Sequence, residues 1–307
     1  MRIGIIGAGP IGSILGAYLA KAGNEVALVD ILKNHLSVIQ KQGLTISGLV
    51  KMTTNVHKTF ETISALKTYA PQAIFLCVKT PVLKVITPEI EQIFHSDQFV
   101  VSAQNGIDVE EEIATHFGRV RTLRLVVNYA GNLVEAGHIE MSFFNKPNYL
   151  GALVTAGEPR AKKLVQVITE AGLDTEFVPD IKKYTWEKAI LNAALSPLCA
   201  LTGMTMKQAM DFEGTYHMAE EILKEGIAVA KSIGYDYGPD FLDHCIQYLK
   251  NAGPHKTSMH VDIENRRPTE IDVINKKIVD YGKKKGIPTP YNEIITSLIK
   301  ATEKRML

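Results

Sequence analysis

The sequence has few cysteines, almost no net charge and no long apolar run, and each absence excludes a class of protein. Cys77, Cys199 and Cys245 show neither C-x-x-C nor Cys/His ligand spacing, so we expect reduced, buried thiols and no metal site. A formal net charge of +1 gives no electrostatic reason to expect nucleic acid or an anionic membrane as a partner. No apolar stretch reaches the length of a membrane span, and a strand beginning at residue 2 leaves no room for a secretory signal. We therefore expect a cytoplasmic protein.

The first thirty residues contain a glycine-rich turn between a strand and a helix. The strand at 3–6 leads into the turn, and an amphipathic helix to residue 21 and a second strand at 25–29 follow it. The first glycine permits a tight turn, the second lets the main chain approach a pyrophosphate, and the third allows the helix to pack on the strand. The amide groups at the helix N-terminus then face the diphosphate. This pattern predicts a dinucleotide site built from Gly7, Ala8, Gly9, Pro10, Ile11 and Gly12.

An acidic residue, Asp30, ends the second strand 18 positions after Gly12. A carboxylate there accepts bonds from the ribose hydroxyls of adenosine and repels a 2′-phosphate. The position favours NAD as the cofactor and does not exclude NADP. The alternative for the glycine-rich stretch is a purely structural turn, because such loops also recur by chance.

Strand-like runs alternate with helical patterns through the first half, which is typical of a parallel sheet covered on both faces. We expect strands at 44–47, 52–56, 73–78, 99–102 and 175–178, and helices at 33–41, from Pro81 and at 159–171. Segments between 119 and 154 favour antiparallel extensions of the sheet. Helical periodicities follow at 181–196, 213–233, 239–250, 270–285 and 290–304. The sequence predicts a Rossmann-type, doubly wound α/β domain over residues 1–179 and an all-helical substrate or dimerisation domain over residues 180–307.

Polar residues follow two of the expected parallel strands, at the edge of the sheet where ligands bind. Lys79 comes after the run 75–78, and Asn105 lies in Gln104-Asn105-Gly106 after the run 99–102. A lysine there can meet a phosphate or a substrate charge, and an asparagine amide can bond to both the nicotinamide ribose and the substrate. The alternative for each is a loop residue that caps the next helix.

The helix expected at 181–196 combines an apolar surface with a polar stripe. Lys188, Asn192 and Ser196 are four residues apart and share one face. Apolar residues surround that face, so the helix should be buried, and a buried ammonium is costly without a partner. The stripe therefore indicates a ligand or internal partners. The alternative is that Lys188 reaches the edge while Asn192 satisfies backbone carbonyls.

A third polar cluster comprises Ser258 in Thr257-Ser258-Met259-His260 and Glu270 in the stretch 266–272. Pro268 suits the first turn of a helix, and acidic residues there are favoured by the helix dipole without any function. For Glu270, a structural role and a functional role therefore stay open at this point.

Together these positions resemble the ketopantoate reductase family over essentially the whole chain. The matching elements are the glycine turn, Cys77-Val78-Lys79, Gln104-Asn105-Gly106, Trp186-Glu187-Lys188 with Asn192 and Pro197, and Ser258 with Arg267-Pro268-Thr269-Glu270-Ile271-Asp272. The resemblance implies an active site in the cleft between a Rossmann domain and a helical domain, a small 2-oxo acid as substrate, and an essential carboxylate at Glu270. Two departures stand out: Asp30 where NADPH-using members carry a basic residue nearby, and Ser196 where many have a second asparagine.

From these residues we predict reduction of a 2-oxo acid to the 2-hydroxy acid by hydride transfer. Lys188 would stabilise the charge growing on the carbonyl oxygen and donate the proton, and Glu270 would orient the substrate or the lysine. Asn105, Asn192, Ser196 and Ser258 would bind substrate, and Lys79 and Asn105 would contact the cofactor. The alternatives are an NAD-dependent D-2-hydroxyacid dehydrogenase for bulky or branched 2-oxo acids and a dinucleotide sensor without catalysis. A homodimer is possible under all three.

Overall fold

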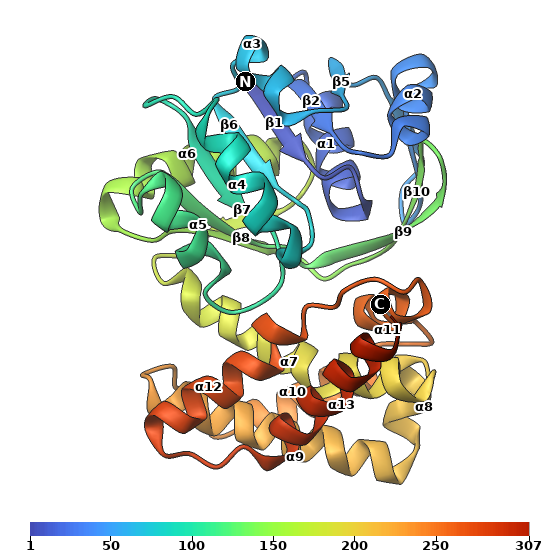
Figure 1. Ribbon diagram of the computed structural model, residues 1–307, viewed down its shortest axis with the longest axis vertical. Coiled ribbons are helices and arrows are strands. Elements are labelled where there is room, and N and C mark those ends of the chain that lie inside the picture. The colour runs from blue at the N-terminus through green and yellow to red at the C-terminus, as the bar shows by residue number, and fades with distance from the viewer. Residues whose placement is uncertain (307) are drawn as a thin grey trace. The chain divides into compact units, whose positions relative to one another are not determined.

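The computed structural model describes residues 1–306, which form two compact units (Figure 1). The first unit comprises Met1–Gln104 and Asp108–Ile181, and the second comprises Asn105–Ile107 and the chain from Lys182 onward. This division resembles the expected one at residue 179. It differs in giving residues 105–107 to the second unit, because Ile107 is buried in the core of that unit and its backbone N–H donates to the Val273 carbonyl over 2.8 Å.

The main sheet of the first unit has eight strands in the order β12-β11-β8-β7-β6-β1-β2-β5. Six of them run parallel in the strand order of a Rossmann fold, which confirms the predicted doubly wound sheet. β11 pairs antiparallel with β8 and parallel with β12, so part of the expected antiparallel extension is present. The strands are β1 (Arg2–Ile6), β2 (Glu25–Val29), β5 (Lys58–Phe60), β6 (Ala73–Leu76), β7 (Phe99–Ser102), β8 (Thr122–Val126), β11 (Asn148–Ala152) and β12 (Thr175–Phe177).

The other β segments form a separate sheet and do not extend the main one. Its order is β4 (Met52–Thr54), β3 (Leu44–Gly48), β10 (His138–Phe144) and β9 (Tyr129–Glu135). β10 pairs with β9 in an antiparallel hairpin and with β3 in parallel, and these pairings use both edges of β10. The expectation that the segments near 129–141 join the main sheet was therefore wrong.

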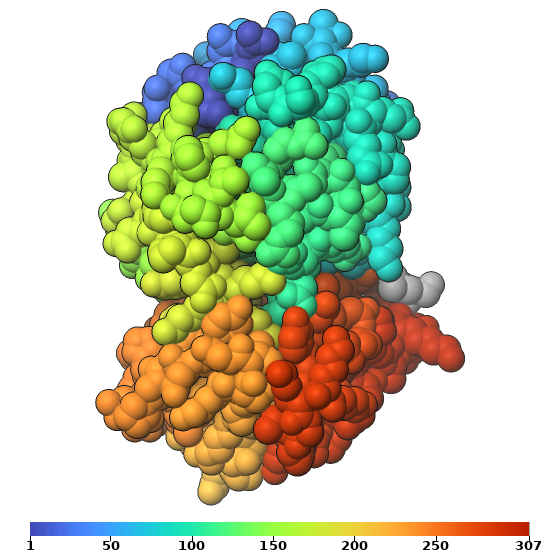
Figure 2. Space-filling model, turned by 90° about the vertical axis from the view of Figure 1, so that its left-hand side faces the viewer, coloured from blue at the N-terminus to red at the C-terminus, as the bar shows by residue number. Residues whose placement is uncertain are grey.

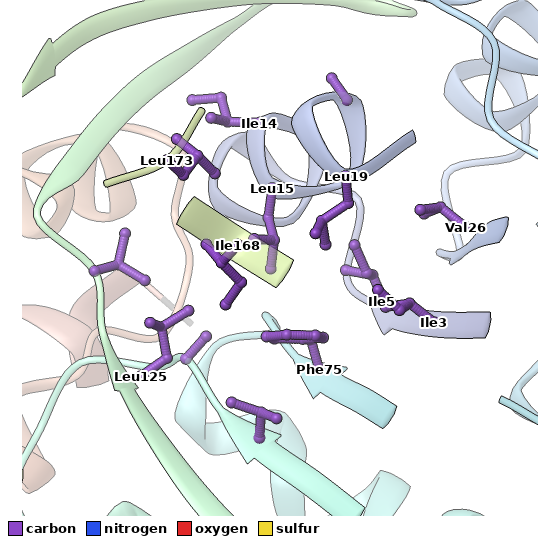
Figure 3. Packing of buried hydrophobic residues seen from close by; sticks show 14 of the residues in the cluster. Ile3, Ile5, Ile14, Leu15, Leu19, Val26, Phe75, Leu125, Ile168 and Leu173 are labelled. Atoms are coloured by element: carbon purple, nitrogen blue, oxygen red, sulfur yellow. The ribbon is translucent and has the colours of Figure 1, made fainter. Parts of the chain in front are cut away.

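Helices cover the main sheet on both faces, with α1 (Pro10–Lys21) and α6 (Glu158–Glu170) on one and α4 (Leu83–Glu91) and α5 (Val109–Phe117) on the other (Figure 1). Helix α1 also packs against β9 and β10, so it lies between the two sheets. Figure 3 shows the core at this point, where Leu15 and Leu19 of α1 meet Ile3, Ile5 and Phe75. The remaining helical segments are α2 (Lys33–Gln42), α3 (Leu66–Tyr69) and the 3₁₀ turns η1 (Ile63–Ala65), η2 (Thr80–Val82) and η3 (Thr155–Gly157).

The described residues of the second unit form helices joined by loops, with no strand among them, as predicted. Its elements are α7 (Ile181–Thr202), α8 (Met206–Asp211), α9 (Glu213–Ser232), α10 (Phe241–Lys250), α11 (Ser258–Glu264), η4 (Ile271–Val273), α12 (Asn275–Lys285) and α13 (Pro290–Met306). In the space-filling view the red segment that holds α12 and α13 packs beside the orange segment before it (Figure 2). Among residues 1–306, no helix is both long and apolar enough to cross a membrane.

Candidate active site

The three glycines of the first turn occupy three different surroundings. Gly7 has φ +100°, and a Cβ there would lie 2.8 Å from the Cys77 carbonyl carbon. A Cβ on Gly12 would overlap the Gly7 carbonyl oxygen, so any larger residue would push the helix from the strand. A Cβ on Gly9 would meet nothing within 4 Å. The turn is therefore closed on its inner side and open at Gly9, where a phosphate group has room to approach the main chain.

The N-terminus of α1 faces the same turn without a side-chain cap. Gly9 is the N-cap residue and has no side chain to cap the first amides, and Pro10 begins the helix. Uncapped amides and the positive end of the helix dipole favour a bound anion. Ile11 lies in this first turn, and its carbonyl accepts a hydrogen bond from the Tyr129 hydroxyl over 3.2 Å. The residues present thus fit the diphosphate of a dinucleotide.

The Asp30 carboxylate is held beside the glycine turn by two backbone groups. The Ala8 N–H donates to Oδ2 over 2.6 Å, and the Leu32 N–H donates to Oδ1 over 3.0 Å. Asp30 is half-buried, whereas Ile31 after it is 86% exposed. The carboxylate is thereby placed at the end of β2 with a defined orientation.

Lys79 is positioned by the strand that contacts the glycine turn. It follows β6 and Cys77-Val78, whose backbone packs directly against Gly7, and it is the N-cap residue of η2. Its carbonyl accepts a hydrogen bond from the Val82 N–H over 3.0 Å. The structure therefore brings the segment of Lys79 next to the glycine turn. Lys79 also caps the next helical turn, as the alternative interpretation expected, but it does so through its backbone carbonyl.

In the second unit, α7 is as buried as its composition predicts. Ala189, Ile190 and Ala193 are at most 1% exposed, while Lys188 and Asn192 on the polar stripe are half-buried. Ser196 is buried at 7% exposure. The helix continues through Pro197 to Thr202, beyond the expected end.

Asn105 and Glu270 meet within this unit although they are far apart in the sequence. The Asn105 Nδ2 donates to Glu270 Oε2 over 3.2 Å, and Glu270 is only 5% exposed. Gly106 makes this approach possible, since it has φ +108° and a Cβ there would overlap Val273. The loop after β7 therefore carries its asparagine to a buried carboxylate of the helical unit.

Glu270 does not lie in the first turn of an α-helix, contrary to the helix expected from residue 270. It is the N-cap residue of the 3₁₀ turn η4, and α12 begins only at Asn275, because Ile274 has non-helical φ −107° and ψ −94°. The backbone before it is anchored by Glu303 of α13, whose Oε1 accepts bonds from the Thr269 N–H and hydroxyl, both over 2.7 Å. The helix-dipole explanation for this carboxylate at an α-helix start therefore does not apply.

Ser258 is exposed at the start of α11. The residue before it, Thr257, caps this helix by accepting a bond from the His260 N–H over 3.2 Å. The Thr257 hydroxyl also donates to the Ser196 carbonyl over 3.3 Å. The structure thus joins the segments of Ser258 and Ser196 through a residue between them that the sequence did not single out.

Several residues that shape these sites were missed by sequence reasoning. Glu303 follows Ile295 and Ile299 at four-residue spacing on the buried face of α13. A carboxylate on such an apolar face indicates a buried hydrogen-bond partner, and the sequence could have shown this. His35 is 3% exposed beside Ala8 and Asn275 is fully buried, with its Nδ2 3.0 Å from the Ala193 carbonyl. Their partners are distant in sequence, so no local pattern identified them.

A Rossmann-type unit with an open glycine turn, joined to a helical unit that holds a half-buried lysine and a buried carboxylate, defines a dinucleotide-dependent oxidoreductase. Family models agree: residues 3–154 match "Ketopantoate reductase PanE/ApbA" and residues 180–303 match "Ketopantoate reductase PanE/ApbA C terminal". The chain belongs to the ketopantoate reductase family. It is an NAD(P)-dependent oxidoreductase, as the sequence predicted.

Similar proteins cover the full length of the chain. A 2-dehydropantoate 2-reductase of Pyrococcus horikoshii is 31% identical over 305 residues, covering 99% of this chain and 98% of that protein. The crystal structure of 2-dehydropantoate 2-reductase from Geobacter metallireducens has a TM-score of 0.91 at 26% identity and covers 98% of this chain and 99% of its own. D-mandelate dehydrogenase with NADH and anilino(oxo)acetate has a TM-score of 0.89 at 28% identity, covering 100% and 99%.

Proposed function

We propose that this protein is a 2-dehydropantoate 2-reductase that uses NADH to reduce ketopantoate to the 2-hydroxy acid. Full-length similarity to proteins of that name supports the reaction. The observation that carries the assignment of a site is the contact between Asn105 and the buried Glu270 in the unit that also holds Lys188 and Asn192. A buried carboxylate is costly unless hydrogen bonds or charges compensate it. The Asn105 amide is one such partner, and a substrate hydroxyl can be another.

Lys188 is the proposed electrostatic stabiliser and proton donor. When bound, the dihydronicotinamide supplies a hydride to the carbonyl carbon, and negative charge develops on the carbonyl oxygen. An ammonium held on a helix surrounded by buried apolar residues interacts with that charge more strongly than one in water. The Lys188 Nζ would then give a proton to the same oxygen.

Glu270 and Asn105 are proposed to orient the substrate. The carboxylate accepts from the Asn105 amide through Oε2, and because a carboxylate accepts several hydrogen bonds, it would also accept one from a substrate hydroxyl or from Lys188. Asn192, Ser196 and Ser258 would bind other polar groups of the 2-oxo acid. Lys79, beside the glycine turn, would hold a cofactor phosphate or the substrate carboxylate.

The NADH preference rests on Asp30. Its carboxylate is fixed beside the turn by the Ala8 and Leu32 amides, and a 2′-phosphate at the end of β2 would meet its negative charge. D-mandelate dehydrogenase, which the chain resembles in fold, is itself described with NADH. We therefore expect NADPH to be the poorer cofactor.

A panel of 2-oxo acids tests the substrate. Ketopantoate, 2-oxoisovalerate and phenylglyoxylate are each assayed with NADH and with NADPH, and kcat/KM is compared across the six pairs. We expect the highest value for ketopantoate with NADH. A higher kcat/KM for phenylglyoxylate would overturn the assignment of ketopantoate as the substrate. A higher kcat/KM with NADPH would show that Asp30 does not select NADH. Activity with none of the acids would favour a dinucleotide sensor.

Replacement of Lys188 tests the site. Lys188→Ala should lower kcat by a factor of about 10² to 10⁴, the usual contribution of a positioned acid, while the NADH dissociation constant stays within about twofold. Lys276→Ala is the matched control, because Lys276 forms an exposed pair with Asp280 on α12. Unchanged kcat in Lys188→Ala, with a control that behaves like the unsubstituted enzyme, would remove Lys188 from the mechanism.

A further inference from the structure

One buried histidine connects the glycine turn to the second sheet. His35 lies on α2 and is 3% exposed. Its Nε2 is 3.0 Å from the Ala8 carbonyl oxygen, and its Nδ1 is 2.9 Å from the Gly137 backbone nitrogen. Gly137 forms the turn of the hairpin between β9 and β10, and a Cβ there would overlap Val38 of α2. A single ring therefore bridges the turn expected to bind a cofactor and a hairpin 102 residues further along the chain.

The two bonds determine the protonation state of the ring. A peptide N–H can only donate, so the Nδ1 that faces Gly137 carries no proton. The proton of the neutral ring is then on Nε2, which donates to the Ala8 carbonyl. The charged ring would carry a second proton on Nδ1, pointing at the Gly137 N–H, and would lose that bond.

Ala8 is held through both groups of its backbone. Its N–H donates to Asp30 over 2.6 Å, and its carbonyl accepts from the Ser13 hydroxyl over 2.7 Å as well as from His35. Asp30 directly follows β2 and Ser13 lies in α1, on either side of the turn, whereas His35 connects the turn to α2 and the hairpin. The orientation of the Ala8 peptide sets both the direction of the open Gly9 main chain and the position of the Asp30 carboxylate.

We infer that His35 is a positioning residue for the cofactor: its neutral ring holds the Ala8 peptide so that Gly9 and Asp30 meet the diphosphate and the ribose. The inference rests on the proposed function, in which this turn binds NADH. His35 makes no contact with the reacting atoms in this scheme, so it governs cofactor affinity and leaves the chemical step unchanged.

The surroundings of the ring give the inference a pH dependence. Burial lowers the pKa of His35 below 6.5, and the Ala8 carbonyl and the charge of Asp30 at the end of β2 partly oppose this. The titratable side chains flanking the hairpin turn, Glu135 and His138, lie 3.7 Å apart and face each other. The neutral ring therefore prevails at neutral pH. As the pH falls through the lowered pKa, protonation breaks the bond from Gly137 and cofactor affinity should fall.

Two variants separate the two bonds. In His35→Asn the side-chain oxygen can replace Nδ1 as the acceptor for Gly137, and the donor to Ala8 is lost. In His35→Gln the side-chain amide can replace Nε2 as the donor, without a group that titrates. We measure the NAD⁺ dissociation constant by calorimetry from pH 5 to 8, and kcat at saturating NADH.

At pH 7.5 we expect His35→Asn to weaken NAD⁺ binding about tenfold, the usual effect of losing a buried hydrogen bond, with kcat within about twofold. His35→Gln should bind within about threefold of the unsubstituted enzyme and should lack its loss of affinity below pH 6.5. His116→Asn is the matched control, since His116 is on α5 and pairs with Glu91 at 2.8 Å.

The outcomes distinguish the inference from the proposed function. Unsubstituted enzyme that binds neither NAD⁺ nor NADP⁺ would overturn both. Normal NAD⁺ binding by His35→Asn, or a pH profile of His35→Gln that still falls like that of the unsubstituted enzyme, would overturn the inference alone. Should His35→Asn fail to fold, the pH profile of His35→Gln decides by itself.

Discussion

At the residue scale, Asp30 is a backbone acceptor whose carboxylate would also bind the ribose under the proposed function. Each of its two oxygens accepts one backbone N–H, from Ala8 and from Leu32. A carboxylate oxygen has two lone pairs, so each retains one for a hydroxyl group. The two amides prevent the carboxylate from rotating away, which makes its charge a fixed part of the surface that an adenosine ribose would meet.

Removing that charge should weaken the discrimination between cofactors. Asp30→Asn keeps the size of the side chain and an oxygen for one backbone amide, but it no longer repels a 2′-phosphate. We expect the ratio of kcat/KM for NADH over NADPH to fall at least about tenfold, mainly through KM. Asp97→Asn, at an exposed position of the same unit, should leave the ratio unchanged. An unaltered ratio in Asp30→Asn would show that this carboxylate does not select the cofactor.

The site residues proposed from the sequence are those that a local pattern can single out. Gly7, Gly12 and Asp30 follow from the spacing within one βαβ unit, and Lys188 and Asn192 follow from one helical face. His35 depends on Gly137, and Glu303 on Thr269 34 residues earlier in the chain. Those partners are set by how strands and helices pack, which a single sequence does not record.

At the scale of the elements, periodicity located the strands and helices but not their assembly. β9 and β10 have the alternation of strands, yet pairing with β3 sets them apart from the main sheet. The apolar pattern from residue 270 predicted one helix, but Glu303 holds Thr269 and the backbone at Ile274 breaks the helical geometry, leaving a 3₁₀ turn before α12. Long-range anchoring overrode local preference in both places.

The anchor on α13 should control Glu270. Glu303→Ala removes the acceptor for two donors of Thr269, so this buried backbone N–H loses its partner and the segment before Glu270 shifts. We expect kcat/KM for the 2-oxo acid to fall about tenfold or more, with an unchanged NADH dissociation constant. Glu303→Gln keeps a carbonyl acceptor and should restore most of the activity.

Glu293→Gln is the control for that series, because Glu293 is exposed on the same helix and pairs with Lys283 at 2.7 Å. Equal losses in Glu303→Ala and Glu303→Gln would show that charge matters there and the hydrogen bonds do not. A loss of NADH affinity in either variant would show that the effect is not confined to the segment of Glu270.

At the scale of the whole molecule, each of the two units contains at least one of the three cysteines. Cys77 belongs to the first unit and lies against Gly7 and Gly12, while Cys199 and Cys245 are in the core of the second. Burial raises the pKa of each thiol from 9.0 to about 12. Thiols with raised pKa values stabilise the fold below pH 9, and this contribution is lost as the pH rises from 9 towards 12. At neutral pH all three are protonated and unreactive.

Thiol labelling in urea should therefore report the opening of each unit. We expect negligible labelling of the folded protein at pH 8. The variant Cys199→Ala/Cys245→Ala, which retains Cys77, should label when the first unit opens, and Cys77→Ala should label when the second does. NADH at 100 times its dissociation constant should raise the free energy of opening at Cys77 by about 2.7 kcal/mol, because only the closed turn binds it.

Rapid labelling of Cys77 in the folded protein would show that the glycine turn opens without urea. If NADH left the free energy of opening at Cys77 unchanged, the cofactor would not bind at this turn.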